Sequence, residues 1–185
     1  MSKFGELVLV VGDACIPFLE KDFPEMFKKM FVPDKFNSVI LTGNMYTSKE
    51  VDFFKRICPN VYLLQSCADY TEGVTDRVCK EVAGYKIVGV EASSLLFVNE
   101  ENRSWIAKKE KADIVVYGDE KVVVEQRDGV VYAAPGSVTG AAKAEGVEGP
   151  SFVLLSLIPS AVNVFTYTLK DGKLDVKKDT FPKSA

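Results

Sequence analysis

Short apolar runs that alternate with helical segments open the chain, and they limit the folds that it can adopt. The runs lie at residues 6–11, 38–42 and 61–65. The first, short and rich in valine, is typical of a strand buried on both faces of the sheet in an α/β protein. The segments between them, 22–31 and 47–57, carry large apolar residues at helical spacing. We therefore expect a βαβαβ start with right-handed crossovers.

The rest of the chain has the pattern of antiparallel hairpins. Asp128-Gly129 separates two valine-rich runs and is the strongest short hairpin signal in the sequence. A helix is expected over 100–109, and no change in composition marks a linker, so residues 1–185 are expected to form one domain. Such a chain can close as a four-layer α/β/β/α sandwich. Further strands are expected at 78–82, 85–90, 114–117, 122–127, 130–134, 152–157, 161–169 and 174–178.

The composition excludes several classes of function. The chain has no histidine, which removes the commonest general acid–base and the commonest transition-metal ligand. A net charge of −3 gives no basic footprint for nucleic acid. No apolar run approaches the roughly 20 residues of a membrane span. The four cysteines form no CxxC pair and the start has no signal-peptide pattern, so a reduced, cytoplasmic protein is expected.

Five segments of the chain carry a resemblance to a known family. They read LVLVVGD at 7–13, FKKMFVP at 27–33, LTGNMYT at 41–47, PGSVTGA at 135–141 and PSFVL at 150–154. The first, third and fourth are similar to the strand-end motifs of calcineurin-like metallophosphoesterases. Taken together, the segments most resemble the small phosphoesterase-fold subunits of the retromer coat. The resemblance implies the fold of metallophosphoesterases, the same four-layer α/β/β/α sandwich.

The resemblance also marks the positions at which an active two-metal phosphoesterase would hold its ions. Asp13 keeps a carboxylate, whereas Asn44 places a neutral amide where a carboxylate should bridge two cations. Lys121 places an ammonium, which offers no lone pair, at another ligand position. No catalytic residue, metal or cofactor is therefore expected, and the chain is interpreted as a degenerate, non-enzymatic relative. The altered set comprises Asp13, Cys15, Asn44, Cys67, Glu91, Asp119 and Lys121.

Other interpretations of these residues stay open. Asp13 and Asn44 are also common turn residues. Asp13, Glu91 and Asp119 could together hold one Mg²⁺ weakly. The ammonium of Lys121 could instead lie among these carboxylates as a resident cation, or it could point to solvent. The alternative functions are a divalent-metal-dependent phosphoesterase with an altered site and a small-molecule sensor that reuses the pocket.

The retromer resemblance implies a scaffold in endosomal protein sorting and retrograde transport, cytoplasmic and peripheral on endosomes. Its partner would be the large retromer subunit, vacuolar protein sorting-associated protein 35, bound through the degenerate metal-site face. Contact with membranes would be indirect, through the complex, and nucleic acid is not an expected partner. An apolar tip for this partner is expected at Leu95, Leu96 and Phe97. A second apolar patch, for regulatory proteins, is expected at Leu7, Phe31, Leu154, Phe165 and Tyr167.

Overall fold

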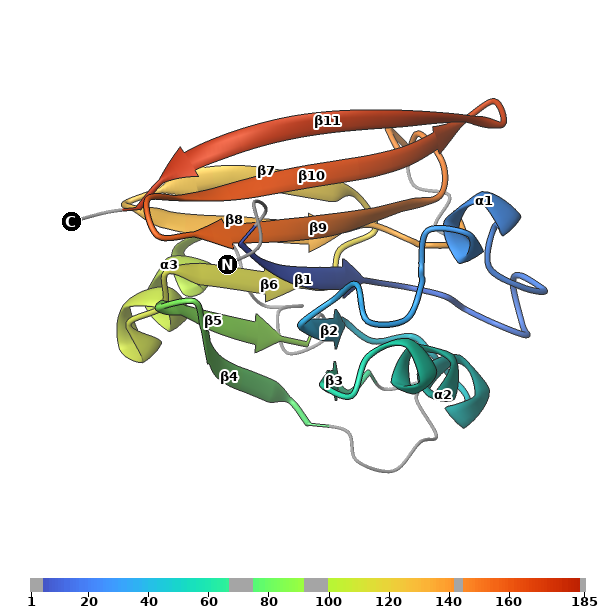
Figure 1. The fold of residues 1–185 in the computed structure, drawn as a ribbon, viewed down its shortest axis with the longest axis horizontal. Helices are drawn as coiled ribbons and strands as arrows, with labels where there is room; N and C mark the ends of the chain where they lie inside the picture. Colours follow the sequence, from blue (N-terminus) through green and yellow to red (C-terminus); the bar gives the residue numbers. More distant parts are fainter. Residues whose placement is uncertain (1–4, 67–74, 92–99, 142–144, 184–185) are drawn as a thin grey trace.

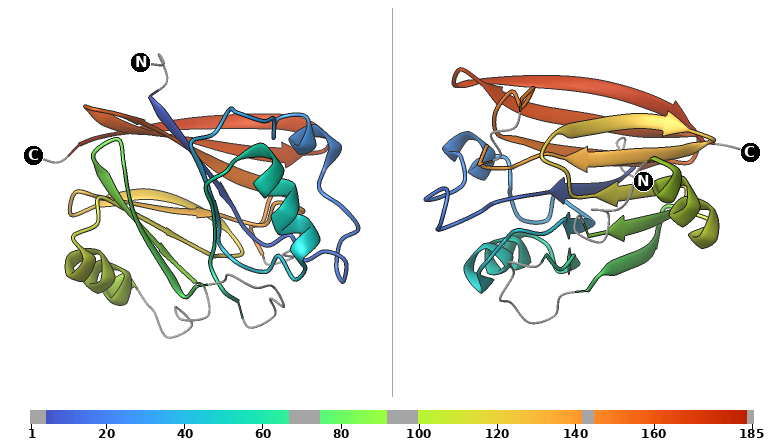
Figure 2. Two further views of the ribbon diagram at one scale, coloured as in Figure 1. Left: turned by 60° about the horizontal axis from the view of Figure 1, so that its bottom comes forward. Right: turned by 180° about the vertical axis from the view of Figure 1, so that it is seen from behind.

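A computed structural model describes residues 5–66, 75–91, 100–141 and 145–183 of the chain. Two β-sheets lie face to face, and short helices cover their outer faces (Figure 1). Figure 2 shows the same layers from two further directions. Among the described residues no helix is long and apolar enough to cross a membrane.

The first sheet combines strands from both ends of the chain. Its order is β11-β10-β9-β1-β2-β3, and the pairs β1–β2 and β2–β3 are parallel as the sequence predicts. β9 pairs antiparallel with β1, so the C-terminal hairpins extend the sheet that the N-terminal strands begin. The strands are β1 Glu6–Val11, β2 Ser38–Leu41, β3 Val61–Leu63, β9 Ser151–Ile158, β10 Ala161–Lys170 and β11 Lys173–Pro182.

The second sheet has the order β4-β5-β6-β8-β7. Its two outer pairs are the antiparallel hairpins that the sequence predicts. In its centre β6 runs parallel to both β5 and β8, which the local pattern does not indicate. The strands are β4 Arg77–Val82, β5 Tyr85–Val90, β6 Ile114–Tyr117, β7 Val122–Arg127 and β8 Val130–Pro135.

Three apolar layers hold this arrangement together. The helices α1 (Glu25–Lys28) and α2 (Ser48–Ile57) pack on the first sheet around fully buried residues such as Phe27 and Phe54. A second layer fills the space between the sheets, and a third lies between the second sheet and α3 (Glu100–Glu110). The order helix, sheet, sheet, helix confirms the predicted four-layer α/β/β/α sandwich.

The unbroken apolar run of β1 follows from this position. Val8 and Val10 point into the layer between the sheets, whereas Leu9 and Val11 point toward the helices. Successive side chains of a strand point to opposite faces, so a strand covered on both faces needs apolar residues at every position. All four side chains are fully buried.

The first helix is much shorter than the expected segment 22–31. α1 has four residues, and Pro24 stands directly before it with an extended backbone. A proline disfavours helical backbone at the residue that precedes it, so Phe23 cannot extend the helix backward. The Asp22 carboxylate accepts hydrogen bonds from the Phe23 amide at 2.8 Å and from the Lys28 ammonium at 2.7 Å. These bonds fix an irregular entry to the helix.

Candidate functional site

The altered metal positions of the N-terminal half lie where β1 and β2 end. Asp13 follows β1 and Asn44 follows β2, and parallel neighbours end at the same edge of a sheet. The Asn44 side-chain amide donates a hydrogen bond to the Asp13 carboxylate, with 2.8 Å between Nδ2 and Oδ1. The Asn44 backbone amide donates to the hydroxyl of Ser66 at 3.2 Å. Three strand ends therefore meet at this point.

The backbone of these loops takes a conformation that suits short polar side chains. Asp13 has a φ of 37° and Asn44 a φ of 55°. Aspartate and asparagine tolerate this left-handed region better than most residues. Cys15, with a φ of 51°, donates its backbone amide to the carbonyl of Asn44 at 2.9 Å. The two loops are thus bonded to each other through both backbone and side chain.

The PGSVTGA segment at 135–141 is hydrogen-bonded to the loop that follows β1. The Ser137 hydroxyl donates to the carbonyl of Asp13 at 2.8 Å, and the Thr139 hydroxyl donates to the carbonyl of Ala14 at 2.8 Å. Ser137 also accepts a hydrogen bond from the amide of Ala141 at 2.9 Å. Both hydroxyl residues are buried. The sequence motif therefore acts by holding the loop after β1, a role that its residue types alone do not reveal.

The residues that the structure describes do not fit the two-metal site of the fold. Among them, no three His, Cys, Asp or Glu side chains lie close enough together to hold a metal ion. Asp13, Glu91 and Asp119, which the sequence leaves open as a weak Mg²⁺ site, do not form such a group. Asn44 turns N–H donors, which have no lone pair for a cation, toward Asp13. Of the altered metal positions, Cys67 lies outside the described residues.

Comparison with known proteins identifies the family. No family model matches the chain. It is 28% identical over 185 residues to vacuolar protein sorting-associated protein 29 of Schizosaccharomyces pombe, covering 96% of this chain and 98% of that protein. A solved structure of vacuolar protein sorting 29 from Cryptosporidium parvum is 30% identical with a TM-score of 0.88, over 97% of this chain and 100% of that one. The chain belongs to the vacuolar protein sorting 29 family.

Membership of the vacuolar protein sorting 29 family confirms the resemblance found in the sequence. A predicted phosphoesterase from Streptococcus pneumoniae shares the fold, with a TM-score of 0.70 and 16% identity over 95% of this chain and 97% of that one. The similarity in fold agrees with the metallophosphoesterase-type sandwich that the sequence predicts.

Lys121 does not act as a resident cation in this member of the vacuolar protein sorting 29 family. Its side chain is exposed, and its ammonium lies beside Gly146. Within the described part of the chain it forms no ion pair with Asp13, Glu91 or Asp119. The Asp119 carboxylate instead accepts the backbone amide of Lys121 at 3.0 Å, a tight turn that directs the chain into β7. The hypothesis of a resident ammonium is wrong.

The predicted regulator patch is only partly exposed. Phe31 and Leu154 are 3% and 7% exposed and belong to the core between the helices and the first sheet. Leu7, Phe165 and Tyr167 pack against that core and stay partly exposed. Phe31 and Leu154 thus contribute mainly to folding, and regulator binding stays a prediction.

The predicted partner tip, Leu95, Leu96 and Phe97, lies outside the described residues.

A different apolar tip, which the sequence analysis does not predict, lies beside the site. Phe18 and Leu19 are 73% and 64% exposed. The amide of Leu19 donates to the carbonyl of Cys15 at 2.9 Å, and the Phe18 ring lies 5.5 Å from that of Tyr46, measured between centroids. The signal was present as four apolar residues, IPFL at 16–19, without helical or strand spacing.

Proposed function

We propose that this chain is a non-catalytic scaffold subunit of the retromer coat. It would dock the large subunit, vacuolar protein sorting-associated protein 35, through the face that carries Asp13 and Asn44. The observation that carries the proposal is the 2.8 Å hydrogen bond between these two side chains. It joins one carboxylate to one neutral amide, so protein groups hold the two loops in place without a metal ion.

The chemistry of the site argues against hydrolysis. A two-metal phosphoesterase uses its ions to activate water and to stabilise the leaving oxygen. A carboxylate that bridges the ions would occupy the position of Asn44, whose amide carries no charge. No histidine is available anywhere in the chain as a general acid.

The apolar tip beside the site supports a protein partner. Phe18 and Leu19 expose more of their surface than the other large apolar side chains of the described residues. Exposed aromatic and aliphatic groups that adjoin a polar centre are typical of protein interfaces and not of sites for small phosphate esters. The tip is bonded to Cys15 and packs on Tyr46, so its position is fixed before a partner binds.

The wider setting follows from the family. The relatives of this chain are named for vacuolar protein sorting, which agrees with a role in protein transport. The proposed location is the cytoplasm and the endosome surface, reached through the complex. Leu95, Leu96 and Phe97 are proposed to contribute to the same docking face. Regulatory proteins are proposed to bind near Phe165 and Tyr167, the partly exposed aromatic residues of β10.

Affinity capture tests the docking face. The double substitution Phe18→Asp/Leu19→Asp should weaken capture of the large retromer subunit by about tenfold or more, because it places charge in a desolvated contact. The melting temperature should hardly change, since both side chains are mostly exposed. Trp105→Asp is the matched control, because Trp105 is 57% exposed but lies on α3. Equal capture by the double variant and the control would place the docking face elsewhere.

A further inference from the structure

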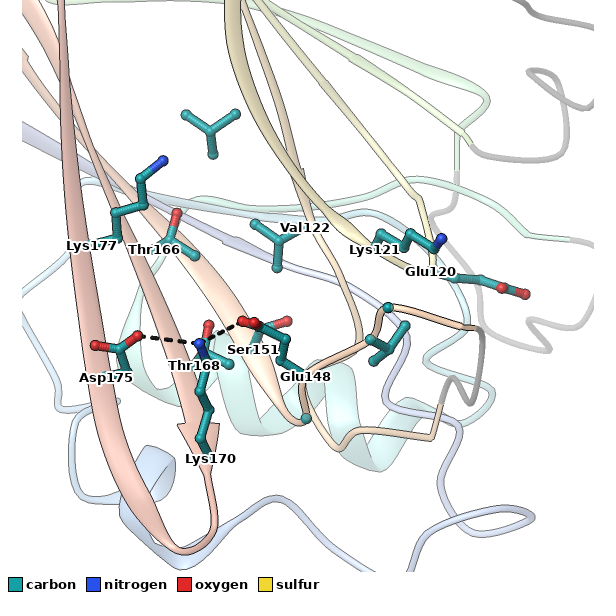
Figure 3. Close-up of a pocket in the computed structure, with 14 residues that line it drawn as sticks. Glu120, Lys121, Val122, Glu148, Ser151, Thr166, Thr168, Lys170, Asp175 and Lys177 are labelled. Carbon is teal, nitrogen blue, oxygen red and sulfur yellow. Dashed lines mark ion pairs between the residues drawn. The ribbon is translucent and has the colours of Figure 1, made fainter.

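A cavity of about 420 Å³ lies between the two sheets at their open edge (Figure 3). Residues of β9, β10 and β11 form one wall, and Val122 and Val124 of β7 form the other. The segment 146–149 lines its mouth. The apolar layer that fills the rest of the space between the sheets gives way here to polar side chains.

Two threonine hydroxyls open onto this cavity. Thr166 and Thr168 are each 7% exposed and line the cavity. They lie on the same face of β10 as Val162 and Val164, which fill the layer between the sheets. Within the described residues neither hydroxyl has a hydrogen bond, although the neighbouring Ser151 donates its own to Pro135 at 2.8 Å. Both hydroxyls can therefore donate to or accept from a polar ligand that enters the cavity.

The cavity lining carries equal numbers of positive and negative groups, and two rows of polar residues cross β10 and β11. The lining includes three ammonium groups and three carboxylates, so it selects neither a simple anion nor a simple cation. In the strand register Thr166 lies opposite Lys177, and Thr168 lies opposite Asp175. The two rows are two residues apart along the strands, which is roughly 7 Å. One row therefore offers a hydroxyl and an ammonium, and the next offers a hydroxyl and a carboxylate. The charged lining residues are Lys121, Lys170, Lys177, Glu120, Glu148 and Asp175.

Both rows retain hydrogen-bond donors or acceptors for a ligand. Lys170 pairs closely with Glu148, at 2.6 Å, and only distantly with Asp175, at 3.5 Å. The Asp175 carboxylate therefore retains acceptor sites. Lys177 pairs with Asp179 at 3.0 Å, and an ammonium carries three donors, so donors remain for another anion.

We propose that this cavity binds a zwitterionic molecule of dipeptide size. Its carboxylate lies against Thr166 and Lys177, and its ammonium lies against Thr168 and Asp175. A free α-amino acid carries both charged groups on one carbon atom, so it is too short to span both rows. The valine side chains of β7 contact the aliphatic part of the ligand. This site is separate from the proposed docking of the large retromer subunit and does not depend on it.

A nuclear magnetic resonance titration with L-alanyl-L-alanine tests the proposal. Saturable shifts of backbone amides in β10 and β11 are expected. Thr166→Val/Thr168→Val keeps the branched shape and removes both hydroxyls, so the affinity should fall about tenfold or more. Thr180→Val is the matched control, because the Thr180 hydroxyl donates to Asn163 at 2.9 Å and is not part of the cavity lining. The control should bind like the parent chain.

Capped probes test the requirement for two charges. N-acetyl-alanyl-alanine lacks the ammonium, and alanyl-alanine amide lacks the carboxylate, so each should bind about tenfold more weakly. Inorganic phosphate should bind no better than either. Asp175→Asn and Lys177→Gln change side chains that are 60% and 68% exposed, so they test the same contacts if the threonine variant does not fold. Equal binding of the dipeptide and a capped probe, or no saturable shift with the dipeptide, would overturn the proposal.

Discussion

The amide of Asn44 donates a 2.8 Å hydrogen bond to the carboxylate of Asp13, although 31 positions separate the two residues in sequence. The contact joins the ends of two parallel strands at the edge where a metallophosphoesterase would hold its ions. It joins the carboxylate to a neutral donor, so protein groups connect the two loops. This bond, together with the exposed tip at Phe18 and Leu19, underlies the scaffold function that we propose.

Asn44→Asp should destabilise the protein at pH 7. The substitution replaces a donor with a second carboxylate beside Asp13, which is 9% exposed, and two adjacent negative charges repel. The free energy of unfolding should fall by about 1–3 kcal/mol, measured by urea denaturation. The loss should shrink as the pH falls below about 5, because a protonated Asp at position 44 can again donate to Asp13.

Asn37→Asp is the matched control for this prediction. The Asn37 side-chain oxygen accepts the backbone amide of Leu7 at 2.7 Å, and a carboxylate accepts the same bond. Its side chain is exposed, so the change should alter the free energy of unfolding by less than about 0.5 kcal/mol. Equal effects of the two substitutions would show that the Asn44–Asp13 contact makes no specific contribution to the free energy of unfolding.

The chain should not hydrolyse bis-p-nitrophenyl phosphate above background with added Mn²⁺, Zn²⁺ or Mg²⁺. The described residues contain no cluster of three potential ligands, and the chain has no histidine. Product release is followed by absorbance, with Asp13→Ala assayed in parallel to detect a contaminating phosphatase. Turnover that requires the metal and disappears in Asp13→Ala would support the phosphoesterase alternative instead.

Tyr117 should make the stability fall at high pH. Burial raises the pKa of Tyr117 to about 12, and its hydroxyl has no hydrogen-bond partner among the described residues. An unfolded tyrosine has a pKa of about 10, so the folded state holds the proton more tightly between the two values. The contribution to stability is therefore complete below about pH 10 and is lost as the pH rises toward 12.

Tyr117→Phe removes this ionisation and an unpaired buried hydroxyl. The free energy of unfolding at pH 7 should stay the same or rise by about 1 kcal/mol. Between pH 10 and 12 the variant should lose stability less steeply than the parent chain. Parallel pH profiles of the two proteins would mean that the Tyr117 phenol ionises as readily in the folded state as in the unfolded one.

The sequence by itself determined most of the local structure. The two-residue hairpin turn that it predicts has a positive φ at both positions, Asp128 (49°) and Gly129 (80°). The apolar runs became the parallel strands β1 and β2, because a strand buried on both faces needs mainly apolar residues. The sequence also indicates that Asp13 and Asn44 follow neighbouring strands, since each comes directly after an apolar run in the chain.

Only the tertiary structure decided which side chains meet. Lys121 stands two residues after Asp119, yet a turn and the entry into β7 carry its ammonium toward Gly146 and away from Asp13. Phe18 is exposed and Phe31 is buried because of how elements distant in sequence pack. The local spacing of apolar residues does not predict that packing. The position of the Thr166 and Thr168 hydroxyls at the cavity likewise depends on how the two sheets pack. Contacts between residues far apart in sequence arise only when the layers close, because side-chain direction and burial are properties of the assembled sandwich.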